Sequence, residues 1–341
     1  MSTGFLDPQT LAAIGSVELR SRLIVEGLMS GMHRSPMQGV SVEFKQHRPY
    51  VAGDDLRFLD WKIFGKTDKL HLKQYVKETN LDLLVMLDAS GSMGYTSLTD
   101  QPAGWTNRWT KWNHACCVAA ALTAVGLAHQ DRVGLSIFGQ ADPGLTPWAS
   151  GGGSGGGASG VRLSNASNHW QAVAHAMQRA EPAVEEAFER DAAGEDVGGG
   201  HTDLAAAIDA VVQRLTRRSL VVLISDLIDD PEHLEAGLRR LRYFRGRGHD
   251  ALVLQVLDPA EVNFEFSSPT DFVGLEGEGR LGLDPAALRA AYREAVTEHL
   301  ERVADLCGRF RFDHLQIDTS EALGPVLSHF FARRASAVSK R

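Results

Sequence analysis

The chain has 341 residues, of which 43% are hydrophobic and 23% charged, as is typical of a globular protein with one large core or two domains. Its formal net charge of -8 argues against sequence-independent nucleic-acid binding, because that activity needs a basic surface. No stretch reaches the roughly 18 apolar residues that span a bilayer, and the N-terminus lacks the basic and apolar regions of a signal peptide. We therefore expect a cytoplasmic protein with no direct membrane insertion.

The first expected element is an amphipathic helix. Asp7 is a suitable N-cap, Pro8 fits the first turn, and Gly31 lies near the expected end. Apolar residues recur at helical spacing between these points. We expect residues 1–35 to form an N-terminal helical segment.

Two segments of the chain have β-rich patterns. Residues 40–44 and 71–76 alternate between apolar and polar side chains, which predicts short antiparallel strands joined by a structured loop. Residues 262–283 again have the pattern of β-hairpins. We expect the two segments, with boundaries 36–80 and 260–284, to pack together as a small accessory β-rich domain.

Strands and helices alternate in the region between these segments. Apolar strands are expected at residues 81–87, 132–138, 220–224, 251–257 and 309–317. Helices are expected between them at residues 111–129, 168–180, 202–215, 231–244 and 284–306. This alternation predicts a doubly wound, mostly parallel α/β sheet over residues 81–259 and 285–335, with a tail at 336–341.

Oxygen-bearing side chains stand at the ends of these expected elements. Asp88, Ser90 and Ser92 form a D-x-S-x-S motif directly after the strand at 81–87. Asp226 directly follows the strand at 220–224, and Thr202 opens a helix after three glycines. Because ligands bind outside the carboxyl ends of the strands in an open α/β sheet, we expect all five residues to meet at one edge.

Two carboxylates and three hydroxyls are hard oxygen ligands. They fit Mg²⁺, with Mn²⁺ or Ca²⁺ as alternatives, and they do not fit zinc, which prefers nitrogen and sulfur. With so few carboxylates, the ion keeps positive character and open positions, so we expect a protein partner to supply an acidic residue that completes its shell. The alternative is that Ser90 and Ser92 only cap the next element.

The motifs together resemble known families. D-x-S-x-S followed by a Thr and an Asp is similar to the metal-ion-dependent adhesion site of the von Willebrand factor type A fold. Residues 48–61, 73–78, 88–93, 272–277 and 318–320 resemble the bacterial "domain of unknown function 58" family, and the likeness covers roughly residues 35–335. The chain departs from the family in its tryptophan-rich loop after Met93, in glycine-rich insertions near residues 150–160 and 191–200, and in lacking the preceding transmembrane helices of many members. Because the insertions lengthen the gap to Thr202, that assignment depends on local sequence.

The resemblance implies a function. Such proteins are associated with MoxR-type AAA+ ATPases, which implies an Mg²⁺-dependent, non-enzymatic adaptor in chaperone-like maturation or assembly of other proteins. The alternative is a metal-assisted phosphohydrolase with Asp88 as nucleophile. Haloacid-dehalogenase-type phosphatases need a second acid two residues later, and Ser90 at that position argues against the enzyme.

Cysteine and tryptophan leave further alternatives. Cys116, Cys117 and Cys307 have no CxxC spacing, so buried reduced thiols are favoured over a metal or redox role. Trp109 and Trp112 are three residues apart and could pack on one helical face, or could form a partner surface together with Trp105.

Overall fold

The structure, a computed structural model, divides into two compact units: Gly31–Asn80, and Met1–Ser30 with Leu81–Arg341. The residues that it describes are 11, 16–17, 19–25, 43–51, 59–76, 81–97, 109–139, 146–147, 159–182, 203–215, 217, 219–246, 249–266, 270–274, 280–283 and 285–324.

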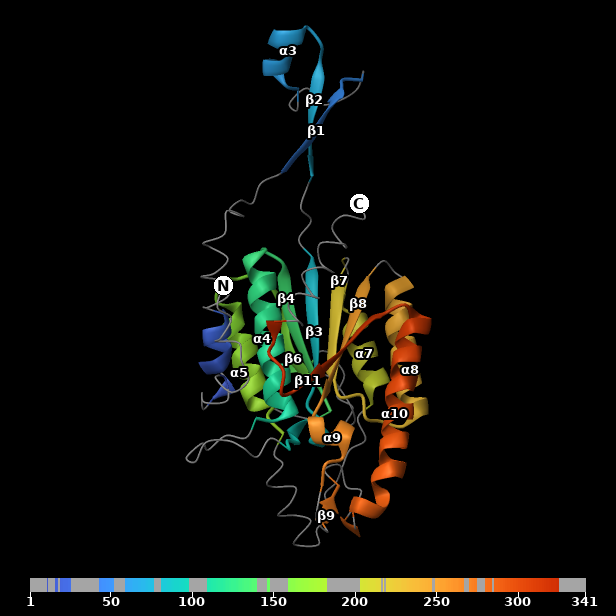
Figure 1. The fold of residues 1–341 in the computed structure, drawn as a ribbon. Coiled ribbons are helices and arrows are strands. Elements are labelled where there is room, and N and C mark those ends of the chain that lie inside the picture. The colour runs from blue at the N-terminus through green and yellow to red at the C-terminus, as the bar shows by residue number, and fades with distance from the viewer. Residues whose placement is uncertain are drawn as a thin grey trace. The chain divides into compact units, whose positions relative to one another are not determined.

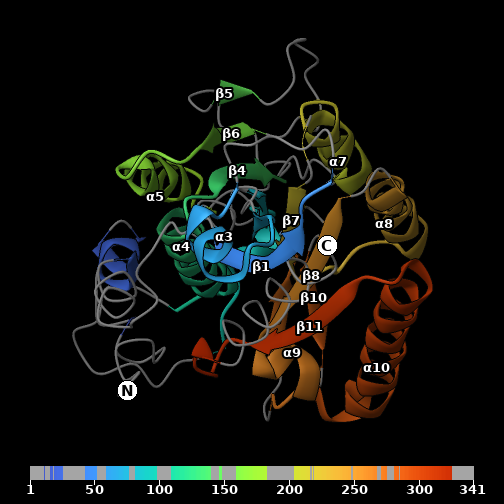
Figure 2. The ribbon, with the colours of Figure 1, turned by 90° about the horizontal axis from the view of Figure 1, so that it is seen from above.

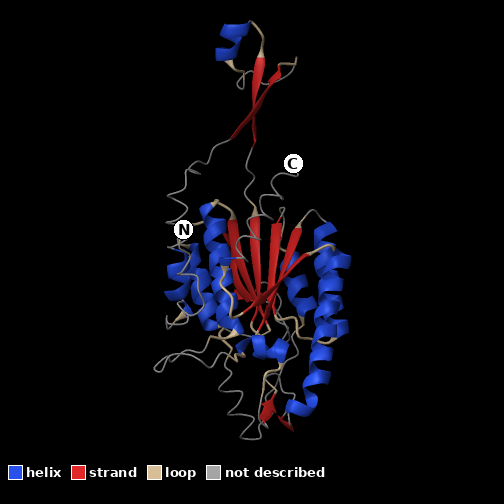
Figure 3. Cartoon of the chain, viewed as in Figure 1, coloured by secondary structure: helices blue, strands red, loops and turns tan. Residues whose placement is uncertain are grey.

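The larger unit is built on a seven-stranded sheet with the order β11-β8-β7-β3-β4-β6-β5 (Figures 1 and 3). Five neighbouring strands are parallel, namely β3 (Asp82–Asp88), β4 (Arg132–Phe138), β7 (Ser219–Ser225), β8 (Asp250–Leu257) and β11 (Asp313–Asp318). One edge is completed by β6 (Ser159–Ser164), which is antiparallel to β4, and by β5 (Thr146–Pro147), which is antiparallel to β6.

Helices cover both faces of this sheet, which explains why its central strands are almost wholly apolar (Figure 2). One face packs on α4 (Lys111–Ala128) and α5 (His169–Arg179), and the other on α7 (Leu204–Val212), α8 (Pro231–Gly246) and α10 (Pro285–Phe310). Successive β3 residues alternate between the two cores, with Leu83 in the first and Leu84 in the second. The predicted fold class, a doubly wound and mostly parallel α/β sheet, is therefore confirmed.

The N-terminal segment belongs to the first of these cores. Residues 17 and 19–25 are helical, and Val17 and Ile24 are buried in the same cluster as α4. Arg20 is also buried, and its guanidinium lies 5.4 Å from the centre of the Trp109 ring. A polar contact thus joins this segment to the start of α4.

The β-rich segments differ in part from their prediction. The smaller unit pairs β1 (Glu43–Pro49) with β2 (His71–Val76), and its expected loop also contains helix α3 (Trp61–Thr67), which Asp60 caps through the amides of Lys62 and Ile63. In the second segment, residues 259–263 form helix α9 (Pro259–Asn263), and a hairpin of β9 (Thr270–Val273) and β10 (Arg280–Leu283) follows. Residues 260–284 group with the larger unit, where Phe264 stacks on Tyr292 of α10 with ring centres 4.2 Å apart. The packing of the two segments into one domain stays a prediction.

Two further differences concern the ends of the sheet. Strand β6 begins at Ser159, inside a stretch that the glycine content had suggested was an insertion. Helix α10 continues to Phe310, so the last strand begins at Asp313 and not at residue 309. Glycine content and helix ends are weak local signals, which tertiary pairing overrides.

The three thiols and two of the tryptophans belong to the core. Cys116, Cys117 and Cys307 are free and buried, as the favoured alternative predicted. Trp109 and Trp112 are 2% and 0% exposed, which supports core packing, whereas Trp105 lies outside the described residues. In the described part of the chain, no helix has the length and hydropathy needed to cross a membrane.

A close contact between α7 and α8 gives a test of the packing. At Gly237 an added Cβ would lie 2.8 Å from both Cγ and Cδ2 of Leu204. Gly237→Ala is therefore expected to destabilise the protein by roughly 1–3 kcal/mol, because overpacking outweighs a gain in helix propensity of about 1 kcal/mol. Urea unfolding measures the difference.

Gly308→Ala is the matched control. Gly308 also lies in a helix, α10, but an added Cβ meets nothing within 4 Å. This variant is expected to be neutral or slightly stabilised. Equal stability of the two variants would contradict the close α7–α8 contact.

Candidate metal centre

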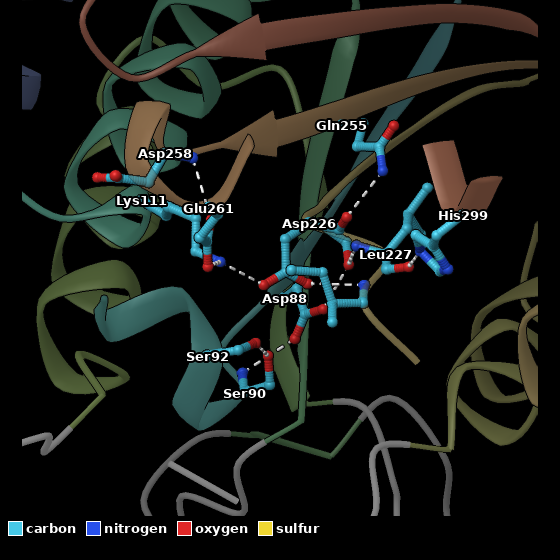
Figure 4. A network of polar contacts seen from close by, with 12 residues as sticks. Asp88, Ser90, Ser92, Lys111, Asp226, Leu227, Gln255, Asp258, Glu261 and His299 are labelled. Atoms are coloured by element: carbon cyan, nitrogen blue, oxygen red, sulfur yellow. Dashed lines mark hydrogen bonds and ion pairs between the residues drawn. The ribbon is translucent and has the colours of Figure 1, made fainter. Parts of the chain in front are cut away.

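Four of the five predicted ligands, Asp88, Ser90, Ser92 and Asp226, lie near the ends of two neighbouring parallel strands. Strands β3 and β7 pair in register up to Leu87 and Ile224, so Asp88 and Ser225 leave the sheet side by side. The Ser225 hydroxyl donates to Asp88 Oδ2 at 2.6 Å, and the Ser90 amide donates to Asp88 Oδ1 at 2.9 Å (Figure 4). Both oxygens of this carboxylate are thereby held in place.

The two serines follow in the short 3-10 helix η3 (Gly91–Gly94) and its N-cap. The Ser90 and Ser92 hydroxyl oxygens are 3.0 Å apart, and hydroxyl oxygens are hard ligands. Gly139, at the end of β4, has a φ of 90°, and an added Cβ would lie 2.7 Å from the Ser90 nitrogen and 2.9 Å from Asp88 Oδ1. Any side chain at this position would displace the motif.

Asp226 completes the described part of the set. It is 2% exposed, its Oδ1 accepts from the Ile228 amide at 3.2 Å, and its Oδ2 accepts from Lys111 Nζ at 2.7 Å. Thr202, the fifth predicted ligand, lies outside the described residues. The neighbouring Asp203 caps α7 by accepting from the Ala206 amide at 2.8 Å.

A pocket of about 30 Å³ opens beside these groups, which is enough for an ion or a water molecule. Its walls combine oxygen donors with apolar side chains, from Asp88, Ser90, Phe138, Leu204, Ser225, Asp226, Leu227, Ile228, Asp229 and Leu234. Ser225 and Asp229 were not predicted from the sequence. They follow from the same signal, the end of β7, and a search of the three residues on either side of Asp226 could have found them.

Charge at the pocket is unbalanced. Burial, reinforced by the nearby charge of Asp226, raises the pKa of Asp88 to about 7, although hydrogen bonds from Ser225 and Ser90 oppose the shift. A cation beside Asp88 would relieve both the repulsion and the loss of hydration. The donors therefore fit a hard divalent ion such as Mg²⁺.

The candidate site contains few ionisable side chains. Within the described ranges, no group of three or more His, Cys, Asp or Glu side chains is arranged to hold a metal. The site would thus combine Asp88 and Asp226 with hydroxyl groups, as the sequence predicted, and with water.

Sequence reasoning missed a buried ion-pair network next to the pocket. Lys111 Nζ contacts Asp226 Oδ2 at 2.7 Å and Glu261 Oε1 at 2.6 Å. Asp258, at the end of β8, is fully buried and accepts from the Ser97 and Ala260 amides, both at 2.9 Å. The D-x-x-E pattern of Asp258 and Glu261 is a capping box and could have been found, whereas nothing in the sequence marks Lys111 as buried.

Comparisons with known proteins agree with the sequence motifs. Residues 46–302 match the family model described as "Protein of unknown function DUF58". The chain belongs to this family. Uncharacterized proteins of Mycobacterium bovis and Mycobacterium tuberculosis are 26% identical to it over 302 residues, which cover 87% of this chain and 81% of theirs.

Solved structures with a related arrangement were also found. BatB, a conserved hypothetical protein from Bacteroides thetaiotaomicron, is 13% identical with a TM-score of 0.44, and the alignment covers 77% of this chain and 100% of that one. An aerotolerance-related membrane protein from Bacteroides fragilis is 14% identical with a TM-score of 0.40 over the same shares.

Asp88→Asn is expected to change how the stability of the metal-free protein depends on pH. Folding raises the pKa of Asp88 from 3.8 to about 7, so in this window the native state holds a proton that the unfolded chain has released. Stability therefore falls as pH rises from about 4 to about 7, by at most about 4 kcal/mol from this group. Asparagine at this position stays neutral, so the variant should lack this part of the fall in stability with rising pH.

Urea unfolding in EDTA at a series of pH values measures the effect. Asp305→Asn, on the exposed side of α10, is the control and should keep the wild-type pH dependence. If both variants follow the wild-type curve, Asp88 is not the carboxyl group whose pKa is raised by folding.

Proposed function

We propose that this chain is an Mg²⁺-dependent protein-binding adaptor with no catalytic activity of its own. In this proposal it acts in the cytoplasm with a MoxR-type AAA+ ATPase, in chaperone-like maturation or assembly of other proteins. The observation that supports it most is the pocket at the carboxyl edge of the sheet, where Asp88 is buried next to Asp226 and beside the hydroxyl of Ser90.

The proposed ion would be held by this chain's own oxygens. Asp88, Ser90 and Ser92 would hold it directly, with Asp226 as a further carboxylate and Thr202 as the remaining predicted ligand. When bound, Mg²⁺ would supply a positive charge and open coordination positions for an anionic oxygen. A carboxylate of the partner fits that role.

The rim of the pocket also favours a macromolecular partner. Ile228 lines the pocket and is 49% exposed, although it is a large apolar side chain. It follows Leu227, whose φ of 56° is unusual for a non-glycine residue. Hydrogen bonds from the Leu227 amide to Ser225 Oγ and from His299 Nε2 to the Leu227 carbonyl stabilise this conformation. An exposed apolar side chain at the rim offers a contact that a bound protein segment would remove from water.

The phosphohydrolase alternative has less support. The position two residues after Asp88, where such enzymes need an acid, holds the Ser90 hydroxyl, which is paired with Ser92. Hydrolysis of p-nitrophenyl phosphate in Mg²⁺ that disappears in Asp88→Asn would favour the enzyme over the adaptor.

Calorimetry with MgCl₂ tests the metal site. The wild-type protein should bind Mg²⁺, and the double variant Ser90→Ala, Ser92→Ala should lose at least about tenfold in affinity, since each lost oxygen ligand must be replaced by water. Thr123→Ala, which removes a hydroxyl inside α4 far along the chain from the motif, is the control. Unchanged affinity in the double variant would contradict the assignment.

Binding to a purified MoxR-type ATPase of the same organism tests the partner. Binding should be lost in EDTA and restored by Mg²⁺. Ile228→Ser should weaken it by roughly tenfold without changing Mg²⁺ affinity, because the apolar contact lies at the rim. Tyr243→Ser, in an α8 side chain that is 73% exposed, should have no effect. Binding that persists in EDTA would mean that the ATPase docks elsewhere.

A further inference from the structure

We propose that Lys111 sets the affinity of the candidate metal centre for divalent cations, by acting as a resident positive charge that already neutralises part of Asp226. This inference builds on the proposed function, because it concerns the same site. Its consequence is that the bound ion depends mainly on Asp88 for negative charge and is left in need of an anionic group from the partner.

The position of Lys111 is unusual for a lysine. It is the first residue of α4 and is 0% exposed, although lysine is almost never fully buried unless it is paired. Its amide donates to the Tyr95 carbonyl at 3.1 Å, which joins the start of α4 to the segment that follows η3. Its ammonium group reaches Asp226 at the carboxyl edge of the sheet (Figure 4).

Two carboxylates from different strand ends share this ammonium group. Nζ lies 2.7 Å from Asp226 Oδ2, beyond β7, and 2.6 Å from Glu261 Oε1, beyond β8. Both carboxylates lie within ion-pair distance of Nζ, so the buried ammonium group is paired and keeps its charge. Asp226 thus contributes less than one full negative charge to a neighbouring ion.

Glu261 affects the cation affinity of the site in the opposite direction to Lys111. Its Oε2 accepts from the Asp258 amide at 3.0 Å, which fixes the side chain, and its Oε1 competes with Asp226 for the ammonium group. Removing the charge of Lys111 should therefore strengthen cation binding, whereas removing the charge of Glu261 should weaken it. At the effective dielectric of a protein, one unit charge a few ångströms from the ion changes its affinity by roughly tenfold or more.

Titration with MgCl₂ in a calorimeter tests the proposal on the full chain. Lys111→Met keeps the length of the side chain without its charge, and it is expected to bind Mg²⁺ roughly tenfold more tightly than wild type. Glu261→Gln is expected to bind it several-fold more weakly. Lys111→Arg keeps the charge and should stay within about threefold of wild type.

Thermal unfolding gives a second readout. Lys111→Met leaves the buried Asp226 and the largely enclosed Glu261 without this ion-pair partner, so it should be less stable than wild type in EDTA. Mg²⁺ should raise its unfolding midpoint by more than it raises that of wild type, because the ion replaces the missing positive charge.

Lys111→Met and Glu261→Gln are expected to change the Mg²⁺ affinity in opposite directions, which distinguishes an electrostatic role of Lys111 from a merely structural one. If Lys111→Met and Glu261→Gln both weaken Mg²⁺ binding, Lys111 only supports the fold and the inference is wrong. Should Lys111→Met fail to fold, an unchanged or increased affinity in Glu261→Gln still overturns it. Wild-type protein that binds no Mg²⁺ overturns the proposed metal site itself, whereas wild-type binding with unchanged variants overturns only this inference.

Discussion

Carboxyl groups with little access to water need hydrogen-bond donors or cations to stabilise their charge. The carboxyl edge of this sheet holds four such groups close together: Asp88, Asp226, Asp258 and Glu261. Asp258 accepts backbone amides, and Asp226 and Glu261 share one ammonium group. Asp88 receives a hydroxyl and an amide, which are neutral donors. Asp258 also receives neutral donors, but of these two carboxyl groups it is Asp88 that lines the pocket.

The parallel register of the central strands makes this concentration of charge unavoidable. Strands β3, β7 and β8 are adjacent, and each ends at or next to an aspartate, so their carboxylates meet in space although they are far apart in sequence. Buried side chains then fix the connecting backbone, as when Gln255 donates to the Asp226 carbonyl at 3.0 Å. The site is held by the sheet and by both helical layers, and not by one loop.

Sequence reasoning found the groups at strand ends and missed those that reach them from elsewhere. An apolar run that ends in aspartate is a local pattern, so Asp88 and Asp226 could be predicted together with the sheet. Lys111 stands 115 residues from Asp226, and its burial depends on how deeply α4 is enclosed, which no local pattern reports. Helix α3 and strand β6 were missed for a related reason, since short elements next to glycine-rich or charged segments are decided by their partners in space. Of the predicted site, four of the five residues can be placed, and Thr202 lies beyond the described part of the chain.

The enclosed helix α4 has one more consequence, which concerns its two thiols. Burial raises the pKa of Cys117 to about 12 and that of Cys116 well above its ordinary value, and the thiolate is the form that reacts with alkylating reagents. These sulfur atoms therefore become reactive only when α4 separates from the sheet. The rate at which a thiol reagent labels Cys116 and Cys117 therefore reports how often the core opens, and no cysteine has to be introduced to measure it. Helix α4 begins with Lys111, which contacts Asp226. The labelling rate would therefore also show whether an ion in the pocket slows the opening of the core.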